Sequence, residues 1–504
     1  MKAGVQRPQV YTFLEMMNDL GLRLTYPEVR FESRYSEIMP SDAELDTKFS
    51  ERVALRVPIV SAAMDTVTEA DMAIALAEYG GIGVIHRGLT PKAQASAVDR
   101  VKHRQNGLIE NPITVPETWS VTQLQSLRRE KGYLFHRFPV LDGAGKLVGL
   151  VTRKDLDVCE DEHVSVSKIM TVAEDLETAP KGIGKREAYE RMRNCKRESL
   201  PLINKDGTLA GLYLFEDLKR ILLGHSTANV DSNDQLRVAA AVGTSEAEME
   251  RVALLLEKKC DVIVIDTAHG HTQSMRLMIE AIRREFGDVE IVAGNVSDPE
   301  AAVALANWGA NGIKVGQGPG SICTTRVVAG IGVPQVSAVG NCARALREAG
   351  FERIPVIADG GMENSGDLVI ALSFGASCGM FGGMLAGTDE APGEIVYDPE
   401  LKQVKKYRGM GSLSAMRDSR AARERYGQQD RAVQKLVAEG VEARVPYKGK
   451  VTLVLDKLSG GLRQGMGYLG ARTIGELLHQ ARPFRVSPVG MRESGVHGVQ
   501  AVAE

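Results

Sequence analysis

The chain has 504 residues, more than the roughly 100–200 residues of one simple domain, so more than one folding unit is predicted. Charged residues make up 25% and the formal net charge is -3, which excludes a strong field favouring nucleic acid or an acidic membrane surface. The six cysteines are scattered without a C-x-x-C pair, which argues against disulfides or zinc and favours a cytoplasmic location. Residues 1–19 lack a secretory signal pattern, and no run of about 18 apolar residues predicts a membrane span.

The chain begins with an irregular region of mixed charge, residues 1–56, which we expect to pack outside the main domain. A strand is predicted over Val57–Ser61, a helix over Ala70–Tyr79 and a second strand over Gly81–His86. The same alternation of apolar strands and helical periods resumes only after residue 236.

Six more strands are predicted in the second half of the chain: Arg237–Gly243, Asp261–Asp266, Glu290–Gly294, Gly312–Gly316, Pro355–Asp359 and Ser377–Phe381. Most are separated by helical periods, and repeated β–α units of this kind predict a parallel sheet. Eight such strands in about 250 residues, once an insertion is set aside, predict an α/β fold of the TIM (β/α)8 barrel type. A doubly wound open sheet has the same spacing and remains the alternative.

The insertion, residues 109–224, lies between the second and third predicted strands and contains an internal repeat. Its halves, about 111–160 and 164–222, each have a helix, an apolar strand around a proline, and a glycine-containing hairpin with a leucine-rich end. The predicted barrel is therefore divided into 1–108 and 225–504. A purely structural paired module is one interpretation of the repeat.

A long charge-rich segment follows the eighth predicted strand, over residues 390–450 (the flap). It far exceeds the roughly 12–15 residues of an ordinary structureless loop, so we expect a functional role. A mobile lid over a ligand site is the physical expectation.

Chemistry-bearing residues gather where the predicted strands end. Active residues of a barrel sit at the C-terminal strand ends, and six candidates fall there: Met64, Asp266, Asn295, Cys323, Asp359 and Gly382. Cys323 ends a tight loop, Gly316-Gln-Gly-Pro-Gly-Ser-Ile-Cys-Thr-Thr-Arg326, whose glycines let the backbone approach a ligand closely. Nearby positive charge favours the reactive thiolate, and Arg326 supplies it in sequence. A buried structural cysteine on a glycine turn is the alternative.

This loop, with the following Val327–Gln335, resembles the catalytic loop of the inosine-5′-monophosphate (IMP) dehydrogenase and GMP reductase family. Matching segments run from about Pro58 to His497. The resemblance implies oxidation of IMP to xanthosine monophosphate (XMP) with NAD, in the guanine-nucleotide branch of purine synthesis, through a thioimidate on Cys323. Two alternatives are NADPH-dependent reduction of GMP to IMP and a catalytically silent nucleotide sensor. The pair Arg425-Tyr426 matches the flap dyad of the dehydrogenase and favours the first activity.

The resemblance also implies roles for individual residues. Arg425 with Tyr426 activates water for hydrolysis, and Thr325 with Glu439 forms a second relay. Asp359 binds the IMP ribose, and a phosphate site contains Gly382 and Gly383, where the family often has Gly-Ser. The full set implied in substrate binding is Met64, Ser321, Asp359, Gly360, Gly361, Gly382, Gly383, Tyr407, Arg408, Gly409, Met410, Gly411 and Glu439. The set implied in cofactor binding is Asp266, Asn295, Gly316 and Gly318.

A potassium ion, regulatory nucleotides and an oligomer are implied as well. The carbonyls of Gly318, Gly320 and Cys323 match potassium ligands, completed by Glu493, Ser494 and Gly495 of a neighbouring subunit. The insertion resembles a tandem pair of CBS modules, which bind adenine or guanine nucleotides, and the matching positions are Thr152, Asp155 and Asp217. Leu214 stands where the second module should carry a hydroxyl. The expected assembly is a homotetramer, or an octamer, with no membrane or nucleic-acid partner.

Overall fold

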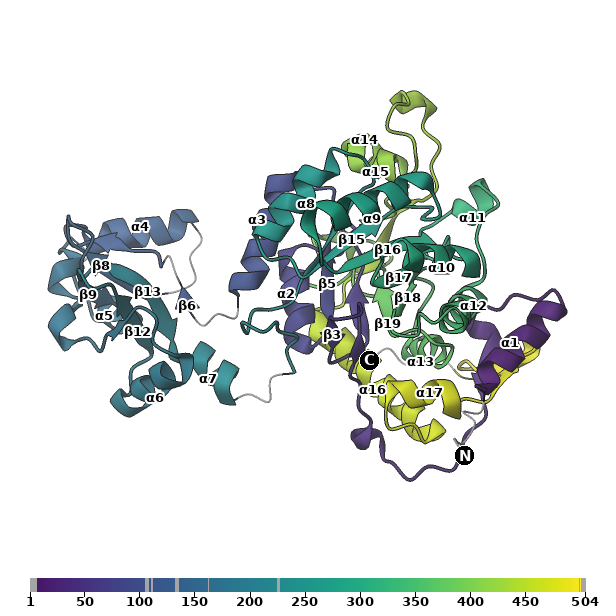
Figure 1. The fold of residues 1–504 in the computed structure, drawn as a ribbon. Helices are drawn as coiled ribbons and strands as arrows, with labels where there is room; N and C mark the ends of the chain where they lie inside the picture. The colour runs from purple at the N-terminus through teal and green to yellow at the C-terminus, as the bar shows by residue number, and fades with distance from the viewer. Residues whose placement is uncertain are drawn as a thin grey trace. The chain divides into compact units, whose positions relative to one another are not determined.

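The structure is a computed structural model, which describes residues 7–104, 108–109, 112–131, 136–161, 163–223, 227–497 and 499. The chain divides into two compact units (Figure 1). The barrel unit comprises Met1–Lys102 and Thr227–Glu504, and the inserted unit comprises His103–Ser226. No helix in the described part of the chain is both long and apolar enough to cross a membrane.

Eight parallel strands of the barrel unit form a closed barrel in the order β14-β15-β16-β17-β18-β19-β4-β5. Their bounds are β4 (Ile59–Ser61), β5 (Ile82–Ile85), β14 (Ala239–Val242), β15 (Val262–Asp266), β16 (Ile291–Val296), β17 (Gly312–Val315), β18 (Val356–Asp359) and β19 (Cys378–Phe381). These are the eight strands that the sequence predicts. The predicted TIM barrel is confirmed, and the open sheet is excluded because β19 pairs with β4 and β5 pairs with β14.

Helices surround the barrel (Figure 1). They are α2 (Ala70–Tyr79), α3 (Pro91–His103), α8 (Glu248–Glu257), α9 (Gln273–Phe286), α10 (Pro299–Asn307), α12 (Gln335–Glu348) and α13 (Ser365–Ser373). Each buries an apolar face against the strands, as in α9, where Met275, Met278, Ile279 and Ile282 are buried at helical spacing. This arrangement leaves the strand ends as the accessible part of the sheet.

The barrel interior is apolar along most of its length and polar at one end. Alternate strand residues point inward, and Val264, Val292 and Met380 belong to this inner core, together with Phe49 and Leu55. Both faces of the strands are buried, which is why these segments read as continuous apolar runs in the sequence. At the C-terminal ends of the strands the inward-facing side chains are charged, and the site described below lies there.

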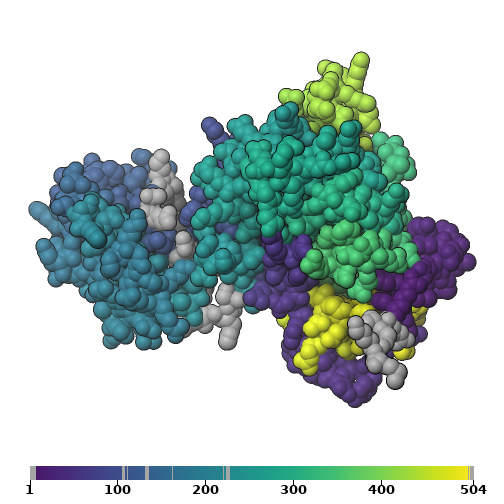
Figure 2. All heavy atoms as spheres, viewed as in Figure 1, coloured from purple at the N-terminus to yellow at the C-terminus, as the bar shows by residue number. Residues whose placement is uncertain are grey.

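The N-terminal region is more regular than the sequence suggests. It contains α1 (Gln9–Asp19) and β1 (Val29–Phe31), and β1 pairs antiparallel with β23 (Pro483–Arg485). Helix α1 buries Val10, Leu14 and other apolar residues against α12, so the expectation of an irregular segment was wrong, although it does pack outside the barrel. Figure 2 shows the purple N-terminal and yellow C-terminal segments side by side on the barrel unit.

The flap contains regular structure. Strands β20 (Ile395–Asp398), β21 (Lys402–Arg408) and β22 (Glu442–Pro446) form a sheet in that order, and β21 pairs with both neighbours. Two short helices, α14 (Leu413–Asp418) and α15 (Arg420–Arg425), lie between β21 and β22 in the chain. Figure 2 shows this yellow-green part standing out from the surface of the barrel unit. The predicted mobility of the flap stays a prediction.

The inserted unit contains two four-stranded sheets with the same design. Their strand orders are β10-β9-β8-β7 and β11-β12-β13-β6. In each, a central antiparallel pair, β8 (Phe138–Leu141) with β9 (Leu147–Val151) or β12 (Ser199–Ile203) with β13 (Leu209–Leu214), carries one register shift. The other strands are β6 (Leu108–Ile109), β7 (Val115–Pro116), β10 (Thr171–Val172) and β11 (Ala179–Pro180). The helices are α4 (Val121–Lys131), α5 (Arg153–Asp157), α6 (Lys185–Cys195) and α7 (Phe215–Leu223).

Candidate active site

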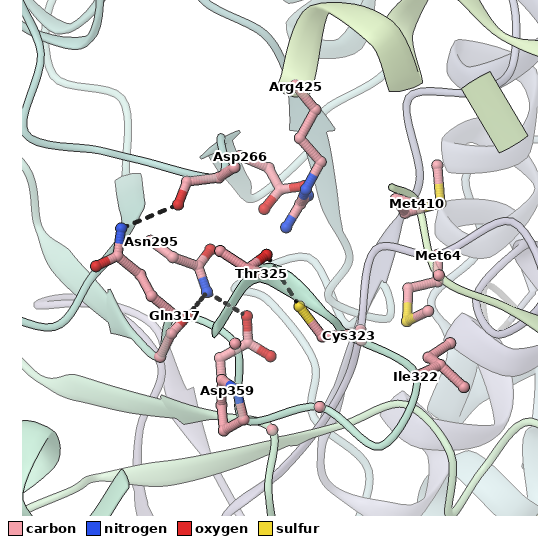
Figure 3. A pocket seen from close by; sticks show the side chains of 18 of the residues that line it. Met64, Asp266, Asn295, Gln317, Ile322, Cys323, Thr325, Asp359, Met410 and Arg425 are labelled. Atoms are coloured by element: carbon pink, nitrogen blue, oxygen red, sulfur yellow. Dashed lines mark hydrogen bonds and ion pairs between the residues drawn. The ribbon is translucent and has the colours of Figure 1, made fainter. Parts of the chain in front are cut away.

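A cavity lies at the C-terminal ends of the barrel strands, and the flap forms part of its wall (Figure 3). It measures about 820 Å³ including its open mouth. Sixteen of the residues predicted for the site line it: Met64, Asp266, Asn295, Gly316, Gly318, Gly320, Cys323, Thr325, Asp359, Gly360, Tyr407, Gly409, Met410, Arg425, Tyr426 and Glu439. They come from strand ends across the barrel and from the flap, so the closed sheet brings distant segments of the chain together.

The loop that carries Cys323 is shaped by glycines and by one arginine. Gly316 has φ of 149°, and a Cβ there would lie 2.2 Å from the carbonyl oxygen of Asp359, so only glycine fits. The Arg326 guanidinium donates hydrogen bonds to the carbonyls of Gln317 and Val333, at 3.1 and 2.6 Å. The Arg326 side chain therefore stabilises the loop by hydrogen bonds to these two backbone carbonyls.

Cys323 faces the cavity and contacts the flap. Its Sγ lies 3.2 Å from Oγ1 of Thr325 and 3.6 Å from the carbonyl oxygen of Glu439 (Figure 3). The loop and the flap also pair through their backbones, because Thr324 N donates to Glu439 O at 2.9 Å and Val441 N donates to Ile322 O at 2.9 Å. The thiol thus sits where a barrel loop and the flap meet.

The other cysteines of the barrel unit have a different environment. Cys260, Cys342 and Cys378 are buried, whereas Cys323 is half-buried. Burial raises the pKa of the Cys260 thiol to about 12 and raises the pKa of Cys342 and Cys378 as well. These three sulfurs are inert structural groups. The position of Cys323 argues against the alternative of a buried structural cysteine.

Opposite charges cluster at the polar end of the barrel. Lys314 Nζ lies 2.8 Å from Oδ1 of Asp266 and 3.0 Å from Oδ2 of Asp359. Asn295 joins the cluster, since its Nδ2 donates to Asp359 Oδ2 at 2.8 Å and to Gly316 O at 2.7 Å, and its Oδ1 accepts from Lys314. Both contacts to Asp359 reach the same oxygen, so its other oxygen can accept hydrogen bonds from a ligand.

Lys314 was missed by the sequence reasoning, yet the sequence carries a signal for it. It is a charged residue inside a short apolar strand, and it is only 2% exposed. Side chains of a strand alternate between its two faces, so residues two positions apart share a face. Asp266, Lys314 and Asp359 each come two residues after an inward-facing position, so all three face the inside of the barrel. A lysine in such a row needs anionic partners, because an unpaired buried charge is very costly.

Arg425 reaches into this cluster from the flap. Its guanidinium forms an ion pair with Oδ2 of Asp266, and Figure 3 shows the side chain extended toward that carboxylate. Both oxygens of Asp266 are thus engaged by cations. Burial lowers the pKa of the Arg425 guanidinium, and the positive charge of Arg87 lowers it further. Burial also raises the pKa of the neighbouring Tyr426 phenol.

Four of the predicted phosphate-site residues lie together beside the cavity. Tyr407 hydrogen-bonds Ser321 and the backbone of Gly383, and burial raises the pKa of Tyr407 to about 12. A Cβ at Gly382 would lie 2.8 Å from the Tyr407 hydroxyl, and a Cβ at Gly383 would lie 3.3 Å from Ser321 Oγ. Gly361 packs near the same loop, where a Cβ would lie 3.1 Å from Pro319.

Other predicted residues lie elsewhere. Arg408 pairs with Asp65 and Asp418, both at 2.6 Å, and Gly411 lies against the Tyr426 ring. Glu493, Ser494 and Gly495 are exposed at the end of α18 (Pro488–Glu493). In the inserted unit Thr152 and Asp155 bond each other at 2.7 Å as the N-terminal cap of α5, and Asp217 lies in the first turn of α7.

A half-buried thiol at the C-terminal mouth of a (β/α)8 barrel, facing a cavity with buried carboxylates, is the arrangement of a barrel enzyme with a cysteine at its active site. The family described as "IMP dehydrogenase / GMP reductase domain" matches residues 23–497. The chain belongs to this family.

Individual relatives cover nearly the whole chain. Inosine-5′-monophosphate dehydrogenase of Aquifex aeolicus is 48% identical over 483 residues, covering 95% of this chain and 96% of that protein. The enzyme of the same name from Halalkalibacterium halodurans is 45% identical, with 95% and 97% covered. Among solved structures, a cysteine-to-alanine variant of GMP reductase from Trypanosoma brucei in complex with guanosine 5′-monophosphate is similar, with a TM-score of 0.86 and 37% identity over 95% of this chain and 98% of that one.

Proposed function

We propose that this protein oxidises IMP to XMP with NAD, the step that commits purine nucleotides toward guanine. The observation that carries the proposal is the presence of Arg425 and Tyr426 in the same cavity as Cys323. This dyad matches the hydrolytic machinery of the dehydrogenase, which the reductase usually lacks. The names of the similar full-length relatives support the same activity.

Substrate binding would use both sides of the cavity. The free oxygen of Asp359 accepts the ribose hydroxyls of IMP, and the cluster around Ser321 and Tyr407 receives the phosphate through hydroxyl and backbone N–H groups. This places the purine beside Cys323. The thiolate adds to C2 of the purine ring, and the resulting adduct loses hydride, leaving a thioimidate on Cys323. NAD, when bound, accepts that hydride.

Hydrolysis would use the flap. Burial lowers the pKa of the Arg425 guanidinium, the direction that an arginine needs if it is to take a proton from water, whereas the ion pair with Asp266 favours its charged form. Water then adds to C2, the C–S bond breaks, and XMP leaves with the thiolate regenerated. Thr325, which contacts Cys323 Sγ, and Glu439 form the second relay for the water proton.

The cofactor and Arg425 would compete for Asp266. The proposed role of Asp266 is to bind the nicotinamide ribose, yet Arg425 engages its Oδ2 in this structure. We therefore infer that this ion pair belongs to the closed arrangement needed for hydrolysis. Departure of the reduced cofactor would free the place that Arg425 then takes.

A potassium ion would be held by the Cys323 loop. Backbone carbonyls suit this cation, and Gly318, Gly320 and Cys323 offer three on one turn. Gly320 O accepts only one hydrogen bond from within the loop, from Cys323 N at 3.0 Å, so a lone pair remains for a cation. The remaining ligands, Glu493, Ser494 and Gly495, would come from a second copy, which requires an oligomer, and a homotetramer is the expected one. Replacing potassium by lithium should lower turnover, measured as NADH absorbance.

The inserted unit would bind purine nucleotides as a CBS pair. Thr152 and Asp155 cap α5 and present their oxygens beside β9, whereas the second half keeps only Asp217. We therefore expect tighter binding in the first half. Titration with ATP and GTP of wild type and Asp155→Ala, followed by calorimetry, tests this assignment.

The activity is tested by absorbance at the NADH band. IMP with NAD should generate NADH, while GMP with NADPH should show no loss of NADPH. The opposite pattern would identify a GMP reductase. No change in either mixture would leave the silent nucleotide sensor as the correct function.

A further inference from the structure

An ion pair between buried Arg87 and partly buried Glu424 links the flap to the barrel next to Arg425. Arg87 follows β5, is 5% exposed, and its Nη1 lies 3.2 Å from Oε2 of Glu424 in α15. The other oxygen of Glu424, Oε1, is buried without a hydrogen-bond partner among the described residues. Glu424 directly precedes Arg425, so the pair holds the residue next to the proposed base.

The end of β14 leaves room for this ion pair, because residue 243 is a glycine. A Cβ at Gly243 would lie 2.1 Å from Arg87 Nη1 and 2.9 Å from Glu424 Oε1. The backbone of Gly243 is in turn held by Glu248 Oε2, which accepts its N–H at 2.8 Å. Any side chain at position 243 would therefore displace the ion pair.

Helix α15 is attached across three neighbouring strands. Strands β5, β14 and β15 are adjacent in the barrel, and they carry Arg87, Gly243 and Asp266 at or just beyond their ends. Glu424 reaches Arg87, while Arg425 reaches Asp266 and its carbonyl accepts from Ala268 N at 3.2 Å. Two consecutive flap residues thus form ion pairs with the barrel on either side of β14.

We propose that Arg87 is a positioning residue that latches the closed flap through Glu424 and so sets the balance between hydrolysis and cofactor binding. The inference rests on the proposed function, in which Arg425 and the cofactor share Asp266. Without the latch, α15 keeps the Asp266 ion pair and the backbone hydrogen bond from Ala268, and Arg87 is left as a buried charge without its partner. The open state gains population, and the open state is the one that admits cofactor.

The test compares two readouts that should move in opposite directions. In Arg87→Met, steady-state turnover should fall while the pre-steady-state burst of NADH is retained. At the same time, inhibition by ADP-ribose, which keeps the ribose proposed for Asp266, should tighten by about three- to tenfold with IMP present. Gly243→Ala should have the same effect without altering either charge, and the exchange of Arg87→Glu with Glu424→Arg should restore wild-type values.

Arg100→Met is the matched control, because Arg100 pairs with Asp71 on the exposed surface of the barrel unit. It should leave turnover and ADP-ribose inhibition unchanged. If Arg87→Met does not fold, Glu424→Gln, which removes charge and almost no volume, carries the same comparison. The latch would be overturned if the wild type oxidises IMP and Arg87→Met either loses turnover and ADP-ribose affinity together or changes neither. No NADH from the wild type would overturn the proposed function and the latch with it.

Discussion

The four cysteines of the barrel unit differ in their access to the cavity, and one loop makes the difference. Cys260, Cys342 and Cys378 are enclosed by apolar side chains, and burial raises the pKa of each thiol. Cys323 follows a glycine-rich turn with few side chains around it, and it lines the cavity. A nucleophile must reach its substrate, so exposure alone separates this cysteine from the others.

Substitution of Cys323 by alanine should abolish NADH formation from IMP, by at least roughly 10³-fold, because no covalent adduct can form. Binding of IMP should persist, since the proposed contacts of Asp359 and Tyr407 with the nucleotide come from other elements. Calorimetric titration with IMP and the absorbance assay check the two parts. Cys378→Ala is the control and should retain turnover. Substantial NADH formation by Cys323→Ala would rule out the covalent mechanism.

Lys314 joins the two carboxylates of the site, and its removal should affect both binding and stability. In Lys314→Met the free energy of unfolding should fall by about 3–5 kcal/mol, because Asp266 and Asp359 lose their shared buried cation. The KM for IMP should rise, since Asp359 loses its orientation. Urea unfolding and initial rates measure these effects.

Lys102 provides the matched control for Lys314. It is 1% exposed and pairs with Asp231 and Asp261, at 3.0 and 2.6 Å, away from the cavity. Lys102→Met should lose comparable stability while the KM for IMP stays unchanged. An unchanged KM in Lys314→Met would show that Lys314 serves stability alone.

At the scale of elements, the flap combines a sheet with a separately attached helix. Strand β21 carries Tyr407 to the proposed phosphate site beside Ser321, and the segment before β22 pairs with the Cys323 loop. Helix α15, by contrast, has only six residues; its Ala422 packs in a small apolar cluster with Met410 and Met416, and Glu424 and Arg425 attach it to the barrel strands. Because few polar contacts join it to the barrel strands, α15 is the part of the flap that we expect to open first.

Replacement of Arg425 by alanine should separate the two chemical steps. Hydride transfer needs only Cys323, IMP and NAD, so a burst of NADH should remain in stopped-flow absorbance. Steady-state turnover should fall by roughly 10²-fold or more, because the proposed general base for water is lost. Arg420→Ala, at an exposed position of the same helix, should behave as wild type. Equal loss of burst and turnover would contradict the role of Arg425 in hydrolysis.

At the scale of the whole molecule, each unit has hydrophobic cores of its own. The barrel unit has a large core between strands and helices and a second inside the barrel. The inserted unit has one core in each half. The two segments of the barrel unit that flank the insertion contact each other. Lys102 pairs with Asp231, and the backbone carbonyl of Lys102 accepts a hydrogen bond from Gln235 Nε2 at 3.4 Å.

Replacement of residues 103–226 by a short glycine–serine linker should therefore leave a folded, active barrel. Turnover of IMP should stay close to wild type, because every residue of the cavity belongs to the barrel unit. Any response to added purine nucleotides should disappear. Thermal unfolding and the absorbance assay measure these outcomes. Loss of turnover in a folded variant would mean that the inserted unit supports catalysis directly.

The sequence by itself determined the eight strands, the glycine loop around Cys323 and the repeat in the insertion, because each depends on residues close together in the chain. Apolar runs form strands wherever both faces will be buried, and a glycine turn needs no distant partner. Only the tertiary structure decided that α1 forms on α12, that Lys314 neutralises two carboxylates, and that Arg87 meets Glu424. The last two residues are 337 positions apart. Such pairs depend on barrel closure and on how the flap folds back, and local patterns of sequence carry neither.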